Sequence, residues 1–166
     1  MCTGVRFADA AGNLYFGRNL DWCESYGEGV VITPRGASIP TQFLGSLSPE
    51  HACVGMGIVV GGVPCYFDCA NEAGLAIAGL NFPGYAQFAE APEEGAVNVA
   101  AYEFPLWVAA SFSTVAEVRE ALKGVVIVAK APSEGYGVAQ LHWLVGDGKE
   151  SIVIECQADG MHVYDD

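Results

Sequence analysis

A cysteine stands second in the chain, where removal of Met1 would give Cys2 both a thiol and a free α-amine. An α-amine has a reference pKa of about 7.7–8, far below that of lysine, so it can act near neutral pH as a general base on its own side chain. Position alone is weak evidence, because cysteine occupies any given position in about 1–2% of proteins. Cys2 is therefore a candidate nucleophile whose role depends on its neighbours.

Two charged residues, Arg18 and Asp21, lie in the otherwise apolar segment FGRNLDW. A buried arginine needs a paired carboxylate, so one interpretation is a structural ion pair. The other is that the guanidinium stabilises a thiolate while the Asp21 carboxylate orients an α-amine. Strands at 2–8 and 14–20, joined by a turn at 10–13, would form a hairpin that brings both residues back toward Cys2.

An asparagine, Asn81, ends an apolar run in the segment LNFPG. Asparagine is costly to bury without hydrogen-bond partners, so its position has two readings. It is either a turn residue before Pro83 and Gly84, or a side-chain amide whose N–H groups stabilise an oxyanion.

Composition and charge exclude several classes of protein. About half of the 166 residues are apolar and only 16% are charged, which excludes intrinsic disorder. The net charge of −13 opposes binding to nucleic acid and to anionic membranes. No apolar run reaches the roughly 18 residues that a spanning helix needs. We therefore expect one globular domain over 1–166.

Six cysteines could suggest disulfides, but the chain starts MCTGVRF, without the features of a signal peptide. Reduced thiols in a cytoplasmic protein fit this start better, and most of the cysteines are expected to be small buried hydrophobes. Cys65 and Cys69 have no second cysteine pair or histidine pair at zinc spacing, so no metal site is expected. His51, His142 and His162 fall in no motif that needs a base.

Short apolar runs between glycine, asparagine and proline turns predict strands over most of the chain. They are expected at 28–34, 53–60, 64–70, 75–81, 125–129, 140–146, 151–156 and 160–164. A change to three- and four-residue apolar spacing predicts a helix over 98–111, with Pro105 in its first turn or at a kink. Ser113 is expected to cap a second helix that ends at Gly124.

Strands followed by two helices and then more strands predict an α+β fold with a helical layer on one face of a sheet. The other face of that sheet would also have to be covered, either by a second sheet or by a partner chain.

Taken together, the segments MCTGVRF, YFGRNLDW, VITPRG, YFDCANEAGLAIAGLNFPGY and LHWLVGDGKESIVIE resemble the choloylglycine hydrolase family. This family includes bile salt hydrolases and penicillin V acylases, which are N-terminal nucleophile hydrolases. The resemblance implies an αββα sandwich and hydrolysis of an amide bond without a cofactor. It also implies a bacterial, cytoplasmic homotetramer that takes a conjugated bile acid as its small-molecule partner.

The resemblance also assigns roles to residues. Cys2 is implied as the nucleophile after loss of Met1, Arg18 as support for the thiolate, Asp21 as the partner of the α-amine, and Asn81 as the oxyanion donor. Four apolar residues fall where family members line the steroid pocket, although ordinary core packing is an equally good reading of them: Leu20, Val60, Phe67 and Tyr136.

One departure is length, because family members are typically about twice as long. We therefore expect the chain to be the N-terminal part of such a domain, with a further active-site asparagine and arginine and most of the second sheet beyond residue 166. Two alternatives stay open. One is a penicillin V acylase or another N-acyl amidase, and the other is an inactive fragment that serves as a binding or assembly module.

Overall fold

The computed structural model describes residues 2–166 and is built on one seven-stranded antiparallel sheet. In spatial order its strands are β13 (Gly160–Asp165), β12 (Ser151–Gln157), β11 (Leu141–Gly146), β8 (Ala76–Asn81), β7 (Val63–Asn71), β6 (Cys53–Val60) and β3 (Gly29–Thr33). Each of these strands falls within two residues of a run that the sequence predicts, because glycine and proline turns mark their ends.

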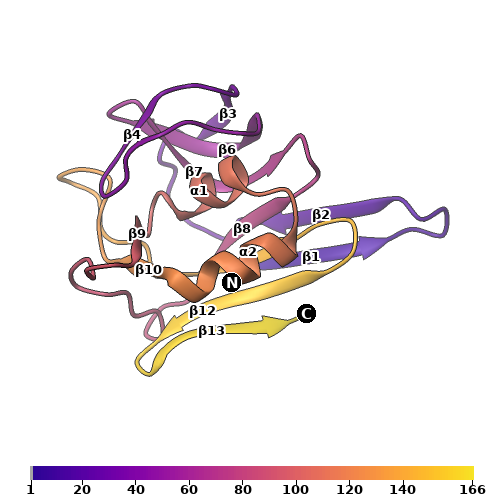
Figure 1. Ribbon diagram of the computed structural model, residues 1–166. Helices are drawn as coiled ribbons and strands as arrows, with labels where there is room; N and C mark the ends of the chain where they lie inside the picture. The colour runs from indigo at the N-terminus through magenta and orange to yellow at the C-terminus, as the bar shows by residue number, and fades with distance from the viewer. Residues whose placement is uncertain (1) are drawn as a thin grey trace.

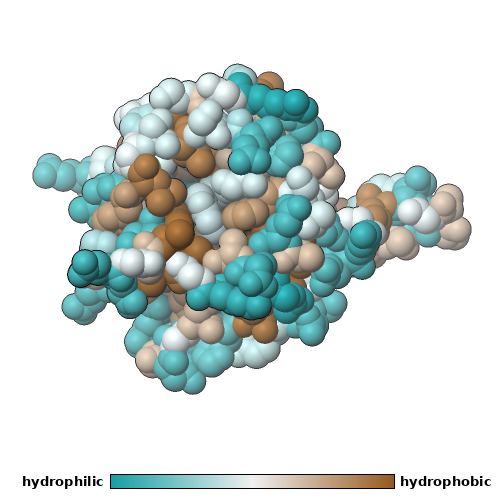
Figure 2. All heavy atoms as spheres, in the orientation of Figure 1, coloured by the Kyte–Doolittle hydropathy of each residue, from teal (hydrophilic) through white to brown (hydrophobic). Residues whose placement is uncertain are grey.

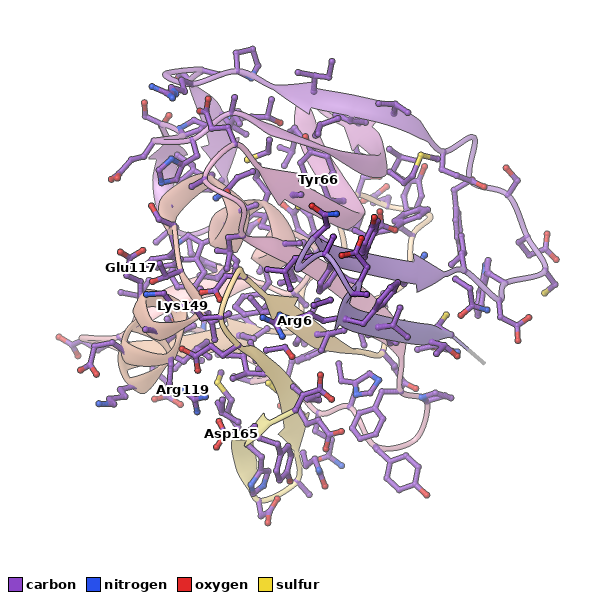
Figure 3. All side chains as sticks on the ribbon, turned by 90° about the vertical axis from the view of Figure 1, so that its right-hand side faces the viewer. Arg6, Tyr66, Glu117, Arg119, Lys149 and Asp165 are labelled. Carbon is purple, nitrogen blue, oxygen red and sulfur yellow. The ribbon has the colours of Figure 1, made fainter. Side chains whose placement is uncertain are left out.

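Two short helices cover one face of this sheet (Figure 1). Helix α1 (Phe104–Ser111) packs mainly on β7 and β8, and all but its last residue are buried. Helix α2 (Val115–Ala121) continues into a 3-10 turn at Leu122–Gly124. An ion pair from Arg119 on α2 to Asp165 on β13 ties this second helix to the sheet edge, where Figure 3 places the two residues close together.

The prediction of one helix over 98–111 is wrong in its first part. Residues Val97–Ala100 form β9, which pairs in parallel with β10 (Val125–Val128). The β-branched residues Val97 and Val99 favour an extended chain, and Pro105 then occupies the first turn of α1, where its missing N–H costs nothing. A further pair, β4 (Ile39–Thr41) with β5 (Gly45–Leu47), is also absent from the predicted elements.

The cap of the second helix lies one residue later than predicted. Thr114, rather than Ser113, accepts the backbone N–H of Glu117, and the Glu117 carboxylate accepts the Thr114 N–H in return. Ser113 bonds to His51 instead, with 3.0 Å between its hydroxyl and the imidazole. Thr114 and Glu117 thus form a capping box, in which two orphan N–H groups are satisfied reciprocally.

The opposite face of the sheet carries the predicted hairpin, made of β1 (Thr3–Ala8) and β2 (Leu14–Asn19). Its base packs over β8 and β11, and a Cβ on Gly4 would lie 2.9 Å from Leu144 Cδ2. Its turn projects beyond the body of the molecule and carries both hydrophobic and hydrophilic residues (Figures 1 and 2). Arg6, near the centre of Figure 3, donates to the Asp147 carbonyl at 2.8 Å and so fastens the hairpin to the β11–β12 turn.

The β1–β2 hairpin covers only part of this face of the seven-stranded sheet. The second sheet or partner chain expected on this side from the sequence is therefore represented only in part, by the two strands of the hairpin. On the far strands β3 and β6, two directly paired couples remain exposed: Val30 with Met56, and Ile32 with Val54.

Residues 2–166 contain no helix that is both long and apolar enough to cross a membrane. All six cysteines are free thiols. Four of them are buried, as the sequence predicts: Cys53, Cys65, Cys69 and Cys156. Burial raises the pKa of Cys53 and of Cys65 to about 11, which keeps these thiols protonated.

Candidate functional site

Cys2 directly precedes β1, at the base of the hairpin. Half-buried Cys2, Gly4 and Arg6 alternate with exposed Thr3 and Val5, as expected for a strand with one face against a sheet. Since Gly4 faces Leu144 and Leu80, the same alternation turns the Cys2 side chain toward the sheet. The thiol therefore lies between two layers of the fold rather than at a free end.

The direction of β1 decides which end of the sheet Cys2 approaches. Gly4 lies over Leu144, and the Arg6 side chain lies over Gly146, so β1 runs alongside β11 in the same direction. Strand β8 is antiparallel to β11 and ends at Asn81, opposite Leu141. The start of β1 and the end of β8 therefore lie at the same end of the sheet, which brings Cys2 and Asn81 into one region.

Arg18 on β2 is the direct partner of Gly4 across the hairpin, and its side chain also points into the space between the layers. Its Nε and Nη2 atoms both donate to the Gly79 carbonyl, at 3.1 and 2.8 Å. Only 6% of the Arg18 side chain is exposed. Arg18 thus joins the hairpin to β8 two residues before Asn81.

The carboxylate that faces Arg18 comes from β7. Asp68 Oδ2 lies 3.5 Å from Arg18 Nη1, and 30% of the Asp68 side chain is exposed. Burial raises the pKa of Asp68, while the Arg18 charge and the backbone N–H of Met56 oppose that rise. The structural ion pair considered for Arg18 from the sequence therefore has a partner fifty residues away. Asp21 is exposed and follows β2 by two residues.

A β-bulge explains why Asp68 faces the hairpin. Met56 pairs with Asp68 and Gly57 pairs with Tyr66, so Phe67 is an extra residue in β7. Without this insertion Tyr66 and Asp68 would share a face. With it, Tyr66 packs in the core and its hydroxyl bonds to Thr33 at 2.8 Å, whereas Asp68 turns to the hairpin side. The bulge thus directs one carboxylate toward Arg18.

Asn81 is half-buried at the end of β8, and its side-chain amide makes no hydrogen bond to any of residues 2–166. The backbone around it is well fixed. Phe82 N–H donates to the Gln140 carbonyl at 2.8 Å, and the Phe82 ring stacks on His142 at 4.7 Å. The open N–H groups of Asn81 are therefore held on a rigid strand end, as an oxyanion donor would require.

Of the four predicted pocket residues, two belong to one aromatic cluster. Tyr26 contacts Phe67 with ring centroids 6.0 Å apart and Tyr136 with centroids 6.5 Å apart. Leu20 is exposed at the end of β2, and Val60 is half-buried at the end of β6. The contacts that define the cluster join aromatic rings and do not test these two aliphatic residues, so their role in a pocket stays a prediction.

Tyr26 and Trp22 are the cluster members that sequence reasoning missed. Their rings stack at 6.5 Å, and about half of each side chain is exposed. Exposed aromatic residues that pack on one another form an apolar wall suited to a flat, rigid ligand. The spacing W-x-x-x-Y after Asp21 was the available signal, but a loop of this kind has no periodicity that would reveal which side chains meet.

Two hollows in residues 2–166 can be compared with the candidate site. One of about 500 Å³ is lined by Glu50, His51, Ser113 and Glu117 among others, and no hairpin residue lines it. The other, of about 180 Å³, lies beside the Arg18–Asp68 pair, between the hairpin and strands β6 and β7. The smaller hollow is the one that touches the candidate site, so size alone does not locate the chemistry. No group of three ligating side chains in residues 2–166 could hold a metal ion.

Comparison with known proteins gives one family. The family model described as linear amide C–N hydrolases of the choloylglycine hydrolase family matches residues 2–166. The bile salt hydrolase/transferase of Bifidobacterium longum subsp. longum is 58% identical over the whole chain, and the conjugated bile acid hydrolase of Lactobacillus gasseri is 53% identical. The chain spans about half the length of these curated relatives, 52% and 53% respectively.

Solved structures give the same fold. A C2A variant of the conjugated bile acid hydrolase from Clostridium perfringens superposes with a TM-score of 0.95 at 37% identity, over all of this chain and 51% of that one. The penicillin V acylase from Agrobacterium tumefaciens superposes with a TM-score of 0.75 at 19% identity, which supports the fold alone. The expected N-terminal nucleophile hydrolase architecture is therefore confirmed for the part that this chain represents.

Proposed function

The chain belongs to the choloylglycine hydrolase family of linear amide C–N hydrolases, and from that premise we propose that the protein hydrolyses the amide bond of glycine- or taurine-conjugated bile acids through Cys2. The observation that carries the proposal is the 53–58% identity over the whole chain to proteins named for bile salt hydrolysis. The grouping of Cys2, Arg18 and Asn81 at one end of the sheet supports it.

The reaction proceeds in two balanced steps. The Cys2 sulfur attacks the amide carbonyl, the α-amine takes the thiol proton, and the carbonyl oxygen becomes an oxyanion near the Asn81 amide. The C–N bond then breaks, glycine or taurine leaves with that proton, and a thioester remains. Water attacks the thioester, which releases the bile acid and restores the thiol.

Three residues of the site have defined parts in this scheme. Arg18 favours the thiolate through its charge, Asp21 orients the α-amine, and Asn81 donates to the oxyanion. The aromatic cluster of Trp22, Tyr26, Phe67 and Tyr136 offers an apolar wall to the steroid. Removal of Met1, which lies outside the described residues, is a condition of the scheme because the peptide bond would otherwise block the α-amine.

The test is release of the free amino acid from taurocholate and glycocholate, measured by mass spectrometry, after intact mass has established that Met1 is absent. Cys2→Ser and Cys2→Ala should abolish release, whereas Cys23→Ser, which alters an exposed cysteine, should keep it. A Cys2→Ala protein as active as the parent would contradict the proposal. So would a processed parent protein that releases neither glycine nor taurine.

Penicillin V is the comparison substrate for the alternative amidase function. Faster release of phenoxyacetate from penicillin V than of taurine from taurocholate would favour that alternative and overturn the bile acid assignment. The tetramer and the cytoplasmic location implied by the resemblance remain predictions, and light scattering on the purified protein measures the first.

A further inference from the structure

Asp68 is a half-buried acidic neighbour of Arg18 to which the proposed mechanism gives no part. It lies on β7, in the seven-stranded sheet, while Arg18 lies on β2, in the hairpin layer. Their 3.5 Å ion pair is therefore a contact between the two layers on either side of the candidate site.

The Arg18 guanidinium is held from two directions. The Gly79 carbonyl on β8 accepts from Nε and Nη2, and Asp68 on β7 faces Nη1. With the carboxylate on one side, part of the positive charge of the guanidinium is neutralised before it acts on anything else. Asp68, which both contacts the Arg18 guanidinium and offsets part of its charge, thus affects the electrostatic potential at the base of the hairpin.

Cys2 lies within that field. It occupies the position diagonal to Arg18 in the hairpin, since Gly4 pairs with Arg18 and Cys2 is two residues earlier on the same face. Diagonal neighbours in an antiparallel pair are about 7–8 Å apart at Cα, within reach of a long side chain. Arg18 is therefore the charged group that links Asp68 to the region of Cys2.

We propose that Asp68 is a positioning residue that holds the Arg18 guanidinium between β7 and β8 and limits the positive charge that Arg18 presents to Cys2. The inference rests on the proposed function, in which Arg18 supports the Cys2 thiolate. It assigns a purpose to the Phe67 bulge, because the bulge turns Asp68 toward the hairpin.

Other charged and titratable groups lie near the Arg18–Asp68 pair and could also affect the pKa of a nearby thiol. Asp21 follows β2, and the Arg6 charge on β1 is directed to the Asp147 carbonyl. His142 on β11 shares the face of Leu80 and pairs with Glu155 at 3.2 Å. The Cys69 thiol adjoins Asp68, but burial raises its pKa far above the working range. A change at Asp68 removes its own contribution to the raised pKa of Cys69, but burial still keeps that thiol protonated.

The experiment measures the rate of Cys2 alkylation by iodoacetamide as a function of pH, in the parent chain and in Asp68→Asn. Trypsin cleaves after Arg6 and Arg18, so Cys2 and Cys23 fall in different peptides and mass spectrometry follows each one separately. The Cys2 peptide is read in its forms with and without Met1. No hydrolase activity is needed, so failure of this inference and failure of the proposed function are distinguishable.

Loss of the Asp68 charge should move the midpoint of the Cys2 rate profile to lower pH by about 0.5 unit, the size expected for one charge at roughly 10 Å in a partly solvated site. The Cys23 profile should stay unchanged. Asp68→Glu should restore the parent profile, and Glu94→Gln, which removes one exposed acidic charge elsewhere, should leave it as it is. An unchanged Cys2 midpoint in Asp68→Asn, or a shift to higher pH, would overturn the proposal.

Folding of each variant is checked in the same samples. Unfolding would expose the buried thiols of Cys53, Cys65 and Cys69, which share the tryptic peptide 36–119, and that peptide would then react at the rate of the Cys23 peptide. If Asp68→Asn unfolds, Asp68→Ser removes the same charge with a smaller side chain and is read against the same two outcomes.

Discussion

The two faces of the seven-stranded sheet differ in how completely they are covered. On the helix side, Ile77, Trp143 and Ile154 are fully buried under α1 and its neighbours. On the hairpin side, Leu80 and Leu144 are covered, but Val30 and Ile32 are each 70% exposed. Apolar packing dominates the first face, although the Glu103 carboxyl and the Asn71 amide are buried there, whereas the second face combines covered, open and charged positions.

The difference explains where the candidate site lies. A buried ion pair loses its hydration, and a well-packed apolar replacement is often as stable or more so. The Arg18–Asp68 pair lies on the incompletely covered face, where Asp68 keeps 30% of its side chain exposed. The helix face provides stability, and the hairpin face has space for polar chemistry.

Truncation of Trp143 should have the largest effect. Trp143 is fully buried and lies 4.7 Å from Phe104, centroid to centroid, so Trp143→Ala should lower the free energy of unfolding by about 3–5 kcal/mol. Urea unfolding followed by circular dichroism measures it. Tyr85→Ala, which truncates a side chain that is 66% exposed, is the matched control. Equal losses in both variants would contradict the contrast between the faces.

A side chain at Gly4 should separate the hairpin from the sheet. Gly4→Val should cost about 1–3 kcal/mol by overpacking, because its Cβ would meet Leu144 Cδ2 at 2.9 Å. Gly17→Val in the same hairpin is the control, since the nearest atom to its Cβ lies at 3.8 Å. Leu144→Ala should relieve the Gly4→Val loss. If both glycine variants unfold at the same urea concentration, the hairpin does not pack as described.

A smaller, pH-dependent effect is expected at Glu103, a buried carboxyl beside α1. Burial raises its pKa, although the Gln42 N–H and the Tyr102 hydroxyl both donate to it. A raised pKa in the folded state means that the carboxyl contributes most below its ordinary value near 4.5 and that this contribution is lost as pH rises. Glu103→Gln cannot ionise and should gain stability relative to the parent protein between about pH 4 and about pH 8.

Thermal unfolding of the two proteins across that range measures the difference. If the stability difference between Glu103→Gln and the parent protein does not change with pH, or falls as pH rises, burial does not raise the pKa of Glu103 in the folded protein. Glu94→Gln, at an exposed site, supplies the baseline for loss of one acidic group.

The smallest effect is expected on the open part of the hairpin face. Ile32→Thr keeps a β-branched residue on β3 and removes little buried area, so stability should change by no more than about 0.5 kcal/mol. Unfolding in urea gives the value. A loss above about 1.5 kcal/mol would mean that this part of the face is covered in solution.

The sequence by itself determined the seven strands of the large sheet, the hairpin and the family. Glycine and proline turns, alternation and the motif segments are local signals, and they indicated residues such as Cys2 and Asn81 directly. It also predicted that the cysteines of the core are buried. Its errors fell at Val97–Ala100, at Thr114 and at the short strands β4 and β5, where local patterns fit more than one structure or are too short to be recognised.

Only the tertiary structure decided which groups meet. Asp21 is three residues from Arg18 in the chain, yet the carboxylate facing the Arg18 guanidinium belongs to Asp68, because a bulge at Phe67 shifts the alternation of β7. Likewise Tyr26 joins Phe67 and Tyr136 across three separate segments. Such contacts depend on register and on layer packing over long sequence separations, which no local pattern records. The candidate nucleophile can thus be proposed from the sequence, whereas the charges that surround it are set by the fold.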